Sequence, residues 1–232
     1  MSTRQNLQPG NLTGRCLTLR TDQPLQPRLQ RQPSSDYHFI SHWVVDASLE
    51  SVAGLLQNYE RQAEWWQSVL LRTERLDSEN PVGTGTTFRY LVSGFLPYSI
   101  QFLTRITAVE SPFEIKIEAA GAFMGEGFLR LNNTKNSGTR MDSEWKIRAR
   151  HPLIRRLSFL FRPVFAQNHI WAMQRGEKGL SLALAKPDLS GDDLRKQLPR
   201  PTFPHNLSFF TRRIRWKPWT KSWEAAYEYG NS

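Results

Sequence analysis

The sequence predicts an α+β fold in which one long helix covers an antiparallel sheet. Residues 86–150 contain a series of segments in which apolar and polar side chains alternate, as they do in strands. Short polar links rich in Gly, Pro and Asn join these segments without intervening helices, which is typical of an antiparallel meander. Residues 162–186 then show a helical period. A helix of about 22 residues spans roughly 33 Å, which is long enough to cover the apolar face of the whole sheet.

The chain has 232 residues, enough for one domain with extensions. We expect residues 37–186 to form the domain. Residues 1–36 are rich in Gln, Pro and Arg and are expected to be a disordered arm, and residues 187–232 a basic, aromatic tail that starts with a linker-like stretch. The formal charge is +10, and most of the excess of basic side chains lies in the two extensions. The charge therefore says more about the extensions than about the domain.

The cysteine content and the apolar runs limit the class of protein. The single cysteine, Cys16, excludes an intrachain disulfide and a zinc site built from several cysteines. The N-terminal residues lack the apolar run of a secretory signal, and no window approaches the roughly 18 apolar residues that a membrane-spanning helix needs. We expect a cytoplasmic protein, with peripheral contact to a membrane left open.

The first expected elements are a strand at residues 37–45 and a pair of short helices after it. Aromatic side chains alternate along the strand. Ser48 offers a capping oxygen to the first helix, in which Val52 and Tyr59 recur at helical spacing. The second helical turn ends at the Trp65–Trp66 pair.

Five further segments read as strands: residues 86–93, 99–110, 113–119, 123–131 and 139–150. The alternation is cleanest where Phe113, Ile115 and Ile117 are separated by charged residues. The side chains expected to point inward are apolar or aromatic: Phe88, Tyr90, Val92, Phe113, Ile115, Ile117, Trp145 and Ile147. Such a lining suits a hydrophobic ligand better than acid–base chemistry on a polar substrate.

The helix at residues 162–186 carries small and polar residues on the face that should meet the sheet. Ala172, Gly176, Gly179 and Ala183 share that face with Asn168, His169 and Met173. Each glycine costs a helix about 1 kcal/mol relative to alanine, so the pair indicates a spatial need. We expect close contact with the sheet near Gly179 and Ala183 and open space near His169 and Met173. Asn168 and His169 could orient a ligand there, or simply be hydrogen-bonded within the protein.

Other chemistries find little support. His38 and His42 lie on one face of a strand about 13 Å apart, too far for one metal ion, and no acidic cluster supplies further ligands. The glycines at 83–85 and 125–127 lack the strand-to-helix context of a phosphate loop. Glu144 should lie on the solvated face of the sheet, paired with Arg130. We predict no metal, no cofactor and no assigned catalytic residue.

Basic and aromatic residues alternate in two places outside the sheet. These could contact an anionic membrane surface, and nucleic acid is a less favoured partner because no RNA-binding module is recognisable. A tail that is solvated or packed on its own domain is an equal alternative. The basic side chains concerned are Arg155, Arg156, Arg212, Arg213, Arg215 and Lys217.

Residues 37–185 resemble the SRPBCC superfamily, the START-like helix-grip group that includes polyketide cyclase/dehydrase-type and coenzyme Q-binding proteins. The matching pieces are "VVDASLESVAGLL", "EWWQSV", "PVGTGTTF", "LPYSIQFLTRI" and "FRPVFAQNHIWAMQRGEKGL". The resemblance implies a curved antiparallel sheet of about six or seven strands that grips the C-terminal helix over a ligand cavity. Because members of the group include both binders and enzymes, the fold alone does not give the activity.

The favoured function is the binding or carrying of a hydrophobic or amphipathic small molecule, such as a lipid, an isoprenoid quinone or a polyketide-like compound. One alternative is a cyclase/dehydrase-type enzyme in which His169 and Tyr90 or Tyr98 steer an enolate. A second is an interaction module that acts through the basic tail. The expected ligand-binding residues are Phe88, Tyr90, Ile115, Ile117, Trp145, Asn168, His169 and Met173.

Overall fold

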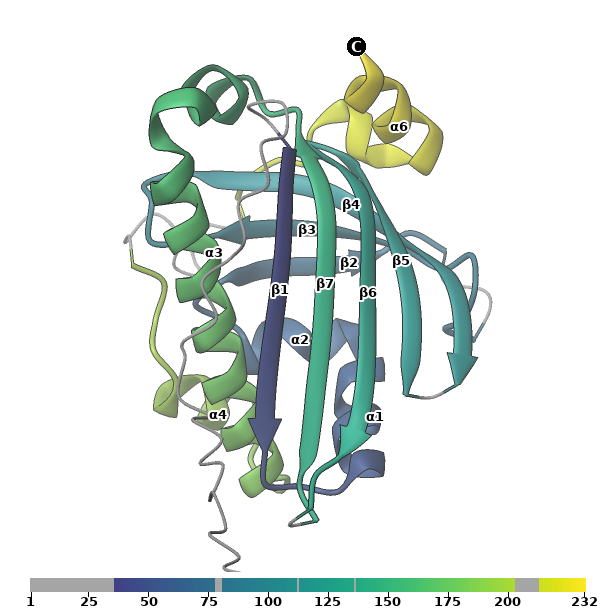
Figure 1. Cartoon of the computed structure of the whole chain (residues 1–232), viewed down its shortest axis with the longest axis vertical. Coiled ribbons are helices and arrows are strands. Elements are labelled where there is room, and N and C mark those ends of the chain that lie inside the picture. Colours follow the sequence, from purple (N-terminus) through teal and green to yellow (C-terminus); the bar gives the residue numbers. More distant parts are fainter. Residues whose placement is uncertain (1–35, 78–80, 112, 136, 203–212) are drawn as a thin grey trace, which may run out of the picture.

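The computed structural model describes residues 36–77, 81–111, 113–135, 137–202 and 213–232, without the side chains of residues 60 and 152–161 (Figure 1). Residues 1–35, which make up nearly all of the expected arm, lie outside the described residues. The elements are β1 (Asp36–Val45), α1 (Leu49–Gln57), η1 (Tyr59–Arg61), α2 (Gln62–Trp65), β2 (Leu70–Arg75), β3 (Thr87–Ser93), β4 (Ser99–Ser111), β5 (Glu114–Gly121), β6 (Phe123–Asn133), β7 (Thr139–Ala149), α3 (Pro152–Ala185), α4 (Gly191–Gln197), η3 (Pro218–Lys221) and α6 (Trp223–Asn231).

The strands form one antiparallel sheet of seven strands in the order β1-β7-β6-β5-β4-β3-β2. The sheet is strongly curved: Figure 1 shows β2, β3 and β4 running across the direction of β1, β7 and β6. Two features assist the curvature: register shifts in β4 and Gly125 in β6, whose φ is +147°. A Cβ at Gly125 would lie 2.0 Å from the backbone oxygen of Lys146, so only glycine fits there. The predicted α+β helix-grip architecture is confirmed.

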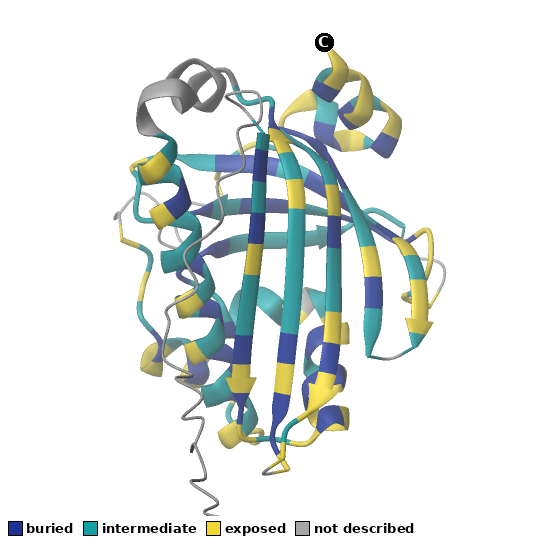
Figure 2. Ribbon diagram, in the orientation of Figure 1, coloured by how far each residue is buried: buried dark blue, intermediate teal, exposed yellow. Residues whose placement is uncertain are grey.

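The long helix α3 lies along the concave side of the sheet. It begins at Pro152, ten residues before the predicted start at residue 162, which corrects the sequence-based boundary. Proline at the first position of a helix is favourable because its missing N–H would have no helical partner there. Pro163 then lies inside the helix. Buried and exposed positions alternate along β1 and β7, as expected for strands with one face toward a core (Figure 2).

One strand was not predicted. β2 is a short edge strand with only Leu70 buried, and its central residues are polar. It pairs with β3, with a register shift between Leu70 and Arg72. Its sequence lacks the alternation of a half-buried strand, because both of its faces are only partly covered.

The segment after α3 packs on the domain, so the expectation of a linker-like stretch is wrong for residues 191–198. Ser190 caps α4 by accepting a hydrogen bond from the Asp193 backbone at 3.2 Å. Leu194 and Leu198 are buried in the main core cluster. The Gln67 side chain donates to the backbone oxygen of Leu198 at 3.2 Å and so fixes the end of this segment.

The last described segment, residues 213–232, packs on part of the convex side of the sheet, with α6 at one end (Figure 1). Trp223 and Ala226 of α6 form a buried cluster with Leu103 of β4 and Ala120 of β5. Before α6, the Trp216 ring contacts two guanidinium groups, those of Arg72 and Arg89, each 4.7 Å from its centroid. The described part of the tail therefore packs on its own domain, which is one of the alternatives expected from the sequence. No helix within the described ranges is both long and apolar enough to cross a membrane.

Candidate functional site

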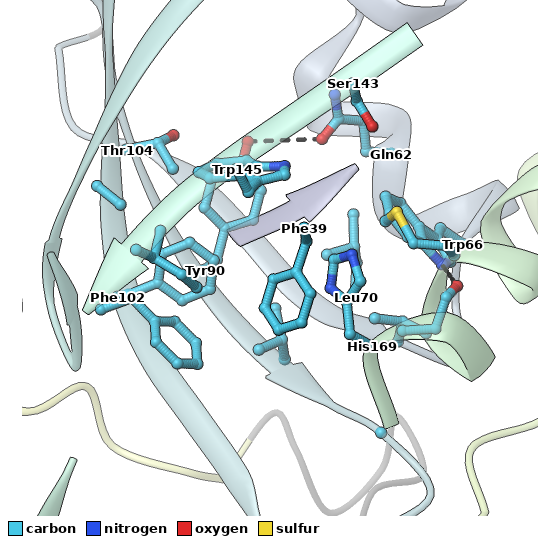
Figure 3. Close-up of a pocket in the computed structure, with 18 of the residues that line it drawn as sticks. Phe39, Gln62, Trp66, Leu70, Tyr90, Phe102, Thr104, Ser143, Trp145 and His169 are labelled. Atoms are coloured by element: carbon cyan, nitrogen blue, oxygen red, sulfur yellow. Dashed lines mark hydrogen bonds between the residues drawn. The ribbon is translucent and has the colours of Figure 1, made fainter. Parts of the chain in front are cut away.

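A cavity of about 330 Å³ lies between the concave side of the sheet and the helices α2 and α3. Every strand contributes to its wall, and its lining is dominated by aromatic and aliphatic side chains. Figure 3 shows Phe39 and His169 side by side, with Tyr90 and Phe102 on one side and Trp66 on the other. The volume falls at the lower end of the range for small-molecule sites, roughly 300–1,000 Å³.

Seven of the eight predicted site residues line this cavity: Tyr90, Ile115, Ile117, Trp145, Asn168, His169 and Met173. Phe88 does not line the cavity, although it lies on the same face of β3 as Tyr90, as predicted. Its side chain is fully buried. The ring of Tyr59 stacks on it with centroids 4.6 Å apart and separates it from the cavity. Phe113, also expected to point inward, packs against the main core cluster instead.

The predicted division of α3 into a packed part and an open part is confirmed. A Cβ on Gly176 would lie 2.4 Å from the Trp43 ring, and one on Gly179 would lie 1.8 Å from the backbone oxygen of Trp65. Both glycines therefore allow close approach. One to two helical turns before Gly176, the residues His169, Ala172 and Met173 line the cavity. The Trp66 indole donates to the backbone oxygen of Ala172 at 3.0 Å and joins the two regions.

His169 faces the cavity as a neutral ring. Its imidazole stacks on Phe39 with centroids 3.9 Å apart, and its Nε2 lies 3.5 Å from the hydroxyl of Ser41. Burial among apolar side chains lowers the pKa of His169 to about 4, because the charged form would lose its hydration. The ring is therefore uncharged at neutral pH and acts through its shape and its hydrogen-bonding nitrogens.

Asn168 is held by the protein itself. Its side-chain oxygen accepts hydrogen bonds from the backbone of Phe95 at 2.8 Å and of Leu96 at 3.4 Å, in the loop between β3 and β4. A Cβ on Gly94 would lie 2.0 Å from the same oxygen, so glycine makes room for this contact. The oxygen of Asn168 thus holds the β3–β4 loop against α3. Of the two roles expected for Asn168, this is hydrogen bonding within the protein and not contact with a ligand.

Three tyrosines of the cavity, Tyr59, Tyr90 and Tyr98, are also neutral at neutral pH. The hydroxyl of Tyr90 lies 3.5 Å from the side-chain oxygen of Gln62, which it can reach as a donor. Burial raises the pKa of Tyr90, and it raises the pKa values of Tyr59 and Tyr98 to about 12. Among the described residues that line the cavity, none is Asp, Glu, Lys or Arg. The cavity therefore offers hydrogen-bonding groups but no compensating charge.

Several lining residues were not predicted as part of a site. Phe39 and Trp43 lie on the inner face of β1, whose alternation did mark that face. Phe102 could not be assigned to the inner face from the sequence, because both faces of β4 are covered at this point. Leu103, on the opposite face, is buried under Trp223 of α6. The sequence of β4 therefore lacks a clear polar face.

The outer face of β7 carries ion pairs, and one prediction there is wrong. Glu144 pairs with His38 at 2.7 Å and with Lys146 at 2.8 Å, whereas Arg130 pairs with Glu114 at 2.9 Å. The predicted Arg130–Glu144 pair fails because Arg130 lies opposite Asp142 in the register of β6 and β7.

No family model and no curated protein matches the sequence. Solved structures do match. TTHA0849 from Thermus thermophilus has a TM-score of 0.52 at 17% identity, over 63% of this chain and 98% of that chain. A START superfamily protein from Mycobacterium smegmatis has a TM-score of 0.47 at 14% identity, over 61% of this chain and 94% of that one. Ara h 8.0201 has a TM-score of 0.48 at 10% identity, over 65% and 99%.

These similarities concern the fold and not the activity, because the identities are low. The TTHA0849 match and the strand order both indicate the same fold. The helix-grip fold that the resemblance to the SRPBCC superfamily implied is confirmed.

Proposed function

We propose that this helix-grip protein binds and carries a hydrophobic or amphipathic small molecule in the cavity between its sheet and α3. The observation that carries the proposal is the cavity of about 330 Å³, walled by aromatic and aliphatic side chains from every strand. The sequence analysis suggested three classes of ligand: a lipid chain, an isoprenoid quinone and a polyketide-like ring system. All three present apolar surface that suits this apolar wall.

The driving force would be the removal of apolar ligand surface from water. At about 25 cal/mol per Å², burying roughly 300 Å² of apolar surface contributes about 7 kcal/mol before the costs of immobilising the ligand. The wall is held in place independently of the ligand, since Gly176 and Gly179 pack directly on Trp43 and Trp65. A preformed cavity reduces the cost of ordering on binding.

Native mass spectrometry tests this proposal. Protein purified under native conditions should carry a small molecule whose mass disappears after denaturation. Ala172 lines the cavity, and Gln174 is exposed on the solvent side of the same helix. Ala172→Leu should reduce the bound fraction by filling the cavity, and Gln174→Leu should not. A chain that is always empty and that rejects lipids and quinones on titration would overturn the proposal.

The enzyme alternative receives less support from the geometry. A general base works best when its pKa lies near the working pH, and His169, with a pKa of about 4, is a weak base at pH 7. Tyr90 can act as a hydrogen-bond donor but is already within reach of Gln62. Binding therefore accounts for the arrangement better than cyclase-type chemistry does.

A second candidate function is contact with an anionic membrane surface. Arg213, Arg215 and Lys217 are exposed along the segment that precedes η3, whereas Trp216 is turned against the sheet. Contact through this segment would thus depend on charge and be weakened by salt. Arg155, Arg156 and Arg212 lie outside the described side chains.

Flotation with vesicles that contain phosphatidylserine tests the membrane candidate. Replacing Arg213, Arg215 and Lys217 together by Gln should abolish flotation, and a salt concentration of roughly 0.5 M should do the same if charge drives the contact. Flotation that is unchanged by the triple substitution would rule out this segment.

A further inference from the structure

We infer that the cavity holds a hydroxyl group of its ligand at Ser143 and His169, which makes an alcohol or a phenol the favoured class of ligand. This inference rests on the proposed binding function and names the chemistry of the molecule bound. It follows from the position of these side chains on a largely apolar wall and from the hydrogen bonds that they do not make within the protein.

Ser143 lies on the inner face of β7, between Asp142 and Glu144, which point outward and form ion pairs. Its neighbours on the inner face, Met141 and Trp145, line the cavity as Ser143 does. Ser143 is partly exposed although β7 is paired on both sides, with β1 and with β6. The space that its side chain meets is therefore the cavity.

Ser41 and His169 complete a small polar group around Ser143. Ser41 lies directly opposite Ser143 in the register of β1 and β7, so the two side chains are neighbours on one face of the sheet. The hydroxyl of Ser41 lies 3.5 Å from Nε2 of His169, at the outer limit of a hydrogen bond. Because His169 belongs to α3, the group joins the sheet to the helix beside the cavity.

This group has hydrogen-bonding capacity that the described part of the chain leaves unused. No hydrogen bond joins the hydroxyl of Ser143 or Nδ1 of His169 to another described residue. A serine hydroxyl donates and accepts, and a neutral imidazole has one donor and one acceptor nitrogen. A ligand hydroxyl, which also donates and accepts, therefore complements both residues in either tautomer of the ring, whereas an ether or ketone oxygen can only accept.

Aromatic rings border the same polar group. Phe39 and Trp145, two residues along each strand from the serines, are register partners and both line the cavity (Figure 3). Phe39 also stacks on the ring of His169. A ligand whose hydroxyl meets Ser143 thus places its adjoining carbon atoms against aromatic side chains, and a naphthalene skeleton is a suitable probe.

Equilibrium dialysis of the full-length protein with two matched compounds tests the inference. The first compound is 2-naphthalenemethanol, and the second is 2-ethylnaphthalene, which has a methyl group in place of the hydroxyl. We expect Ser143→Ala and His169→Phe each to weaken binding of the alcohol roughly three- to tenfold and to leave binding of 2-ethylnaphthalene nearly unchanged. The phenylalanine variant keeps a ring against Phe39 and removes only the nitrogens.

Two controls separate binding from structure. Ser99 belongs to β4 and does not line the cavity, so Ser99→Ala should bind both compounds as the unmodified protein does. Ser143→Ala should leave the Tm unchanged, because its hydroxyl has no described partner to lose. A role of Ser143 in holding the fold together would instead lower the Tm.

The outcomes separate this inference from the function on which it rests. If neither compound binds and no lipid or quinone does, the proposed function fails. If a lipid or quinone binds and the alcohol does not, the proposed function stands and the inference is wrong. The inference is also wrong if the substitutions at Ser143 and His169 leave binding of the alcohol intact, or if they weaken both compounds equally, because the residues would then only shape the cavity.

Discussion

The imidazole ring of His169 lies against the phenyl ring of Phe39, with centroids 3.9 Å apart and planes 12° from parallel. Phe39 belongs to β1 and His169 to α3, so the stack joins the first strand to the long helix beside the cavity. Burial of the imidazole at this place favours its neutral form, because the charged form would lose its hydration.

Acid should destabilise the protein through His169. Its pKa is about 4 in the folded protein and 6.5 as the ordinary value, so between these the unfolded chain binds a proton that the folded chain does not. Stability is therefore full above pH 6.5 and is lost as the pH falls toward 4, by about 2 kcal/mol between pH 7 and pH 5. Urea unfolding at both pH values should show this loss, and His169→Gln should remove it. An identical pH dependence in the variant would contradict the assignment.

Gly179 should be intolerant of a side chain. Alanine usually stabilises a helix, but here its Cβ would lie 1.8 Å from the backbone oxygen of Trp65. We expect Gly179→Ala to lower the free energy of unfolding by about 2 kcal/mol, because backbone must move to relieve the overlap. Gly54 is the matched control, since it lies in α1 and a Cβ added there would meet nothing within 4 Å. Gly54→Ala should raise stability by about 0.5–1 kcal/mol. A stabilising effect at Gly179 would refute the close packing.

Asn168 should act on the loop between β3 and β4. Its side-chain oxygen accepts from the backbone of Phe95 and Leu96. Asn168→Ala should therefore speed the hydrogen exchange of these two amides and lower stability by about 1 kcal/mol, whereas Asn168→Asp keeps an acceptor and should protect them. Mass-spectrometric hydrogen exchange measures the difference. Equal protection of this loop in the alanine variant would show that Asn168 does not fasten it.

Trp223 should stabilise the domain from the outside. Its side chain is 9% exposed, packs with Leu103 and Ala120, and has the Arg105 guanidinium 4.4 Å from its ring centroid. Trp223→Ala should cost about 3 kcal/mol through the lost contacts. Tyr227, on the same helix, is 52% exposed, and Tyr227→Ala should change stability by less than about 0.5 kcal/mol. Similar, small effects of both substitutions would mean that α6 contributes little to the fold.

The sequence predicts the sheet well where one face is buried and the other solvated. Ile115 and Ile117 illustrate this, since their alternation with charged residues places them correctly on the cavity wall. The prediction fails where a distant segment changes the environment. β4 lacks a polar face because α6 covers Leu103, and Phe88 is kept out of the cavity because Tyr59 stacks on it. Such contacts join residues far apart in the chain, so no local period records them.

The candidate site, too, could be predicted only in part from the sequence. Small residues on α3 indicated both a tight contact and an open space, and the structure divides them as expected. The hydrogen bonds from the backbone of Phe95 and Leu96 to Asn168 could not be identified beforehand, because they join residues far apart in the chain.

Methionine methyl groups give the most direct test of the central claim, that the cavity binds a ligand. Met141 and Met173 line the cavity, whereas Met124 contacts Gly230 of α6 on the outer side of the sheet. The protein labelled with ¹³C at its methionine methyl groups is titrated with 2-naphthalenemethanol and followed by NMR. Saturable shifts of Met141 and Met173, with Met124 unmoved, are the predicted result. Shifts confined to Met124, or none at saturating ligand, would contradict a binding site between the sheet and α3.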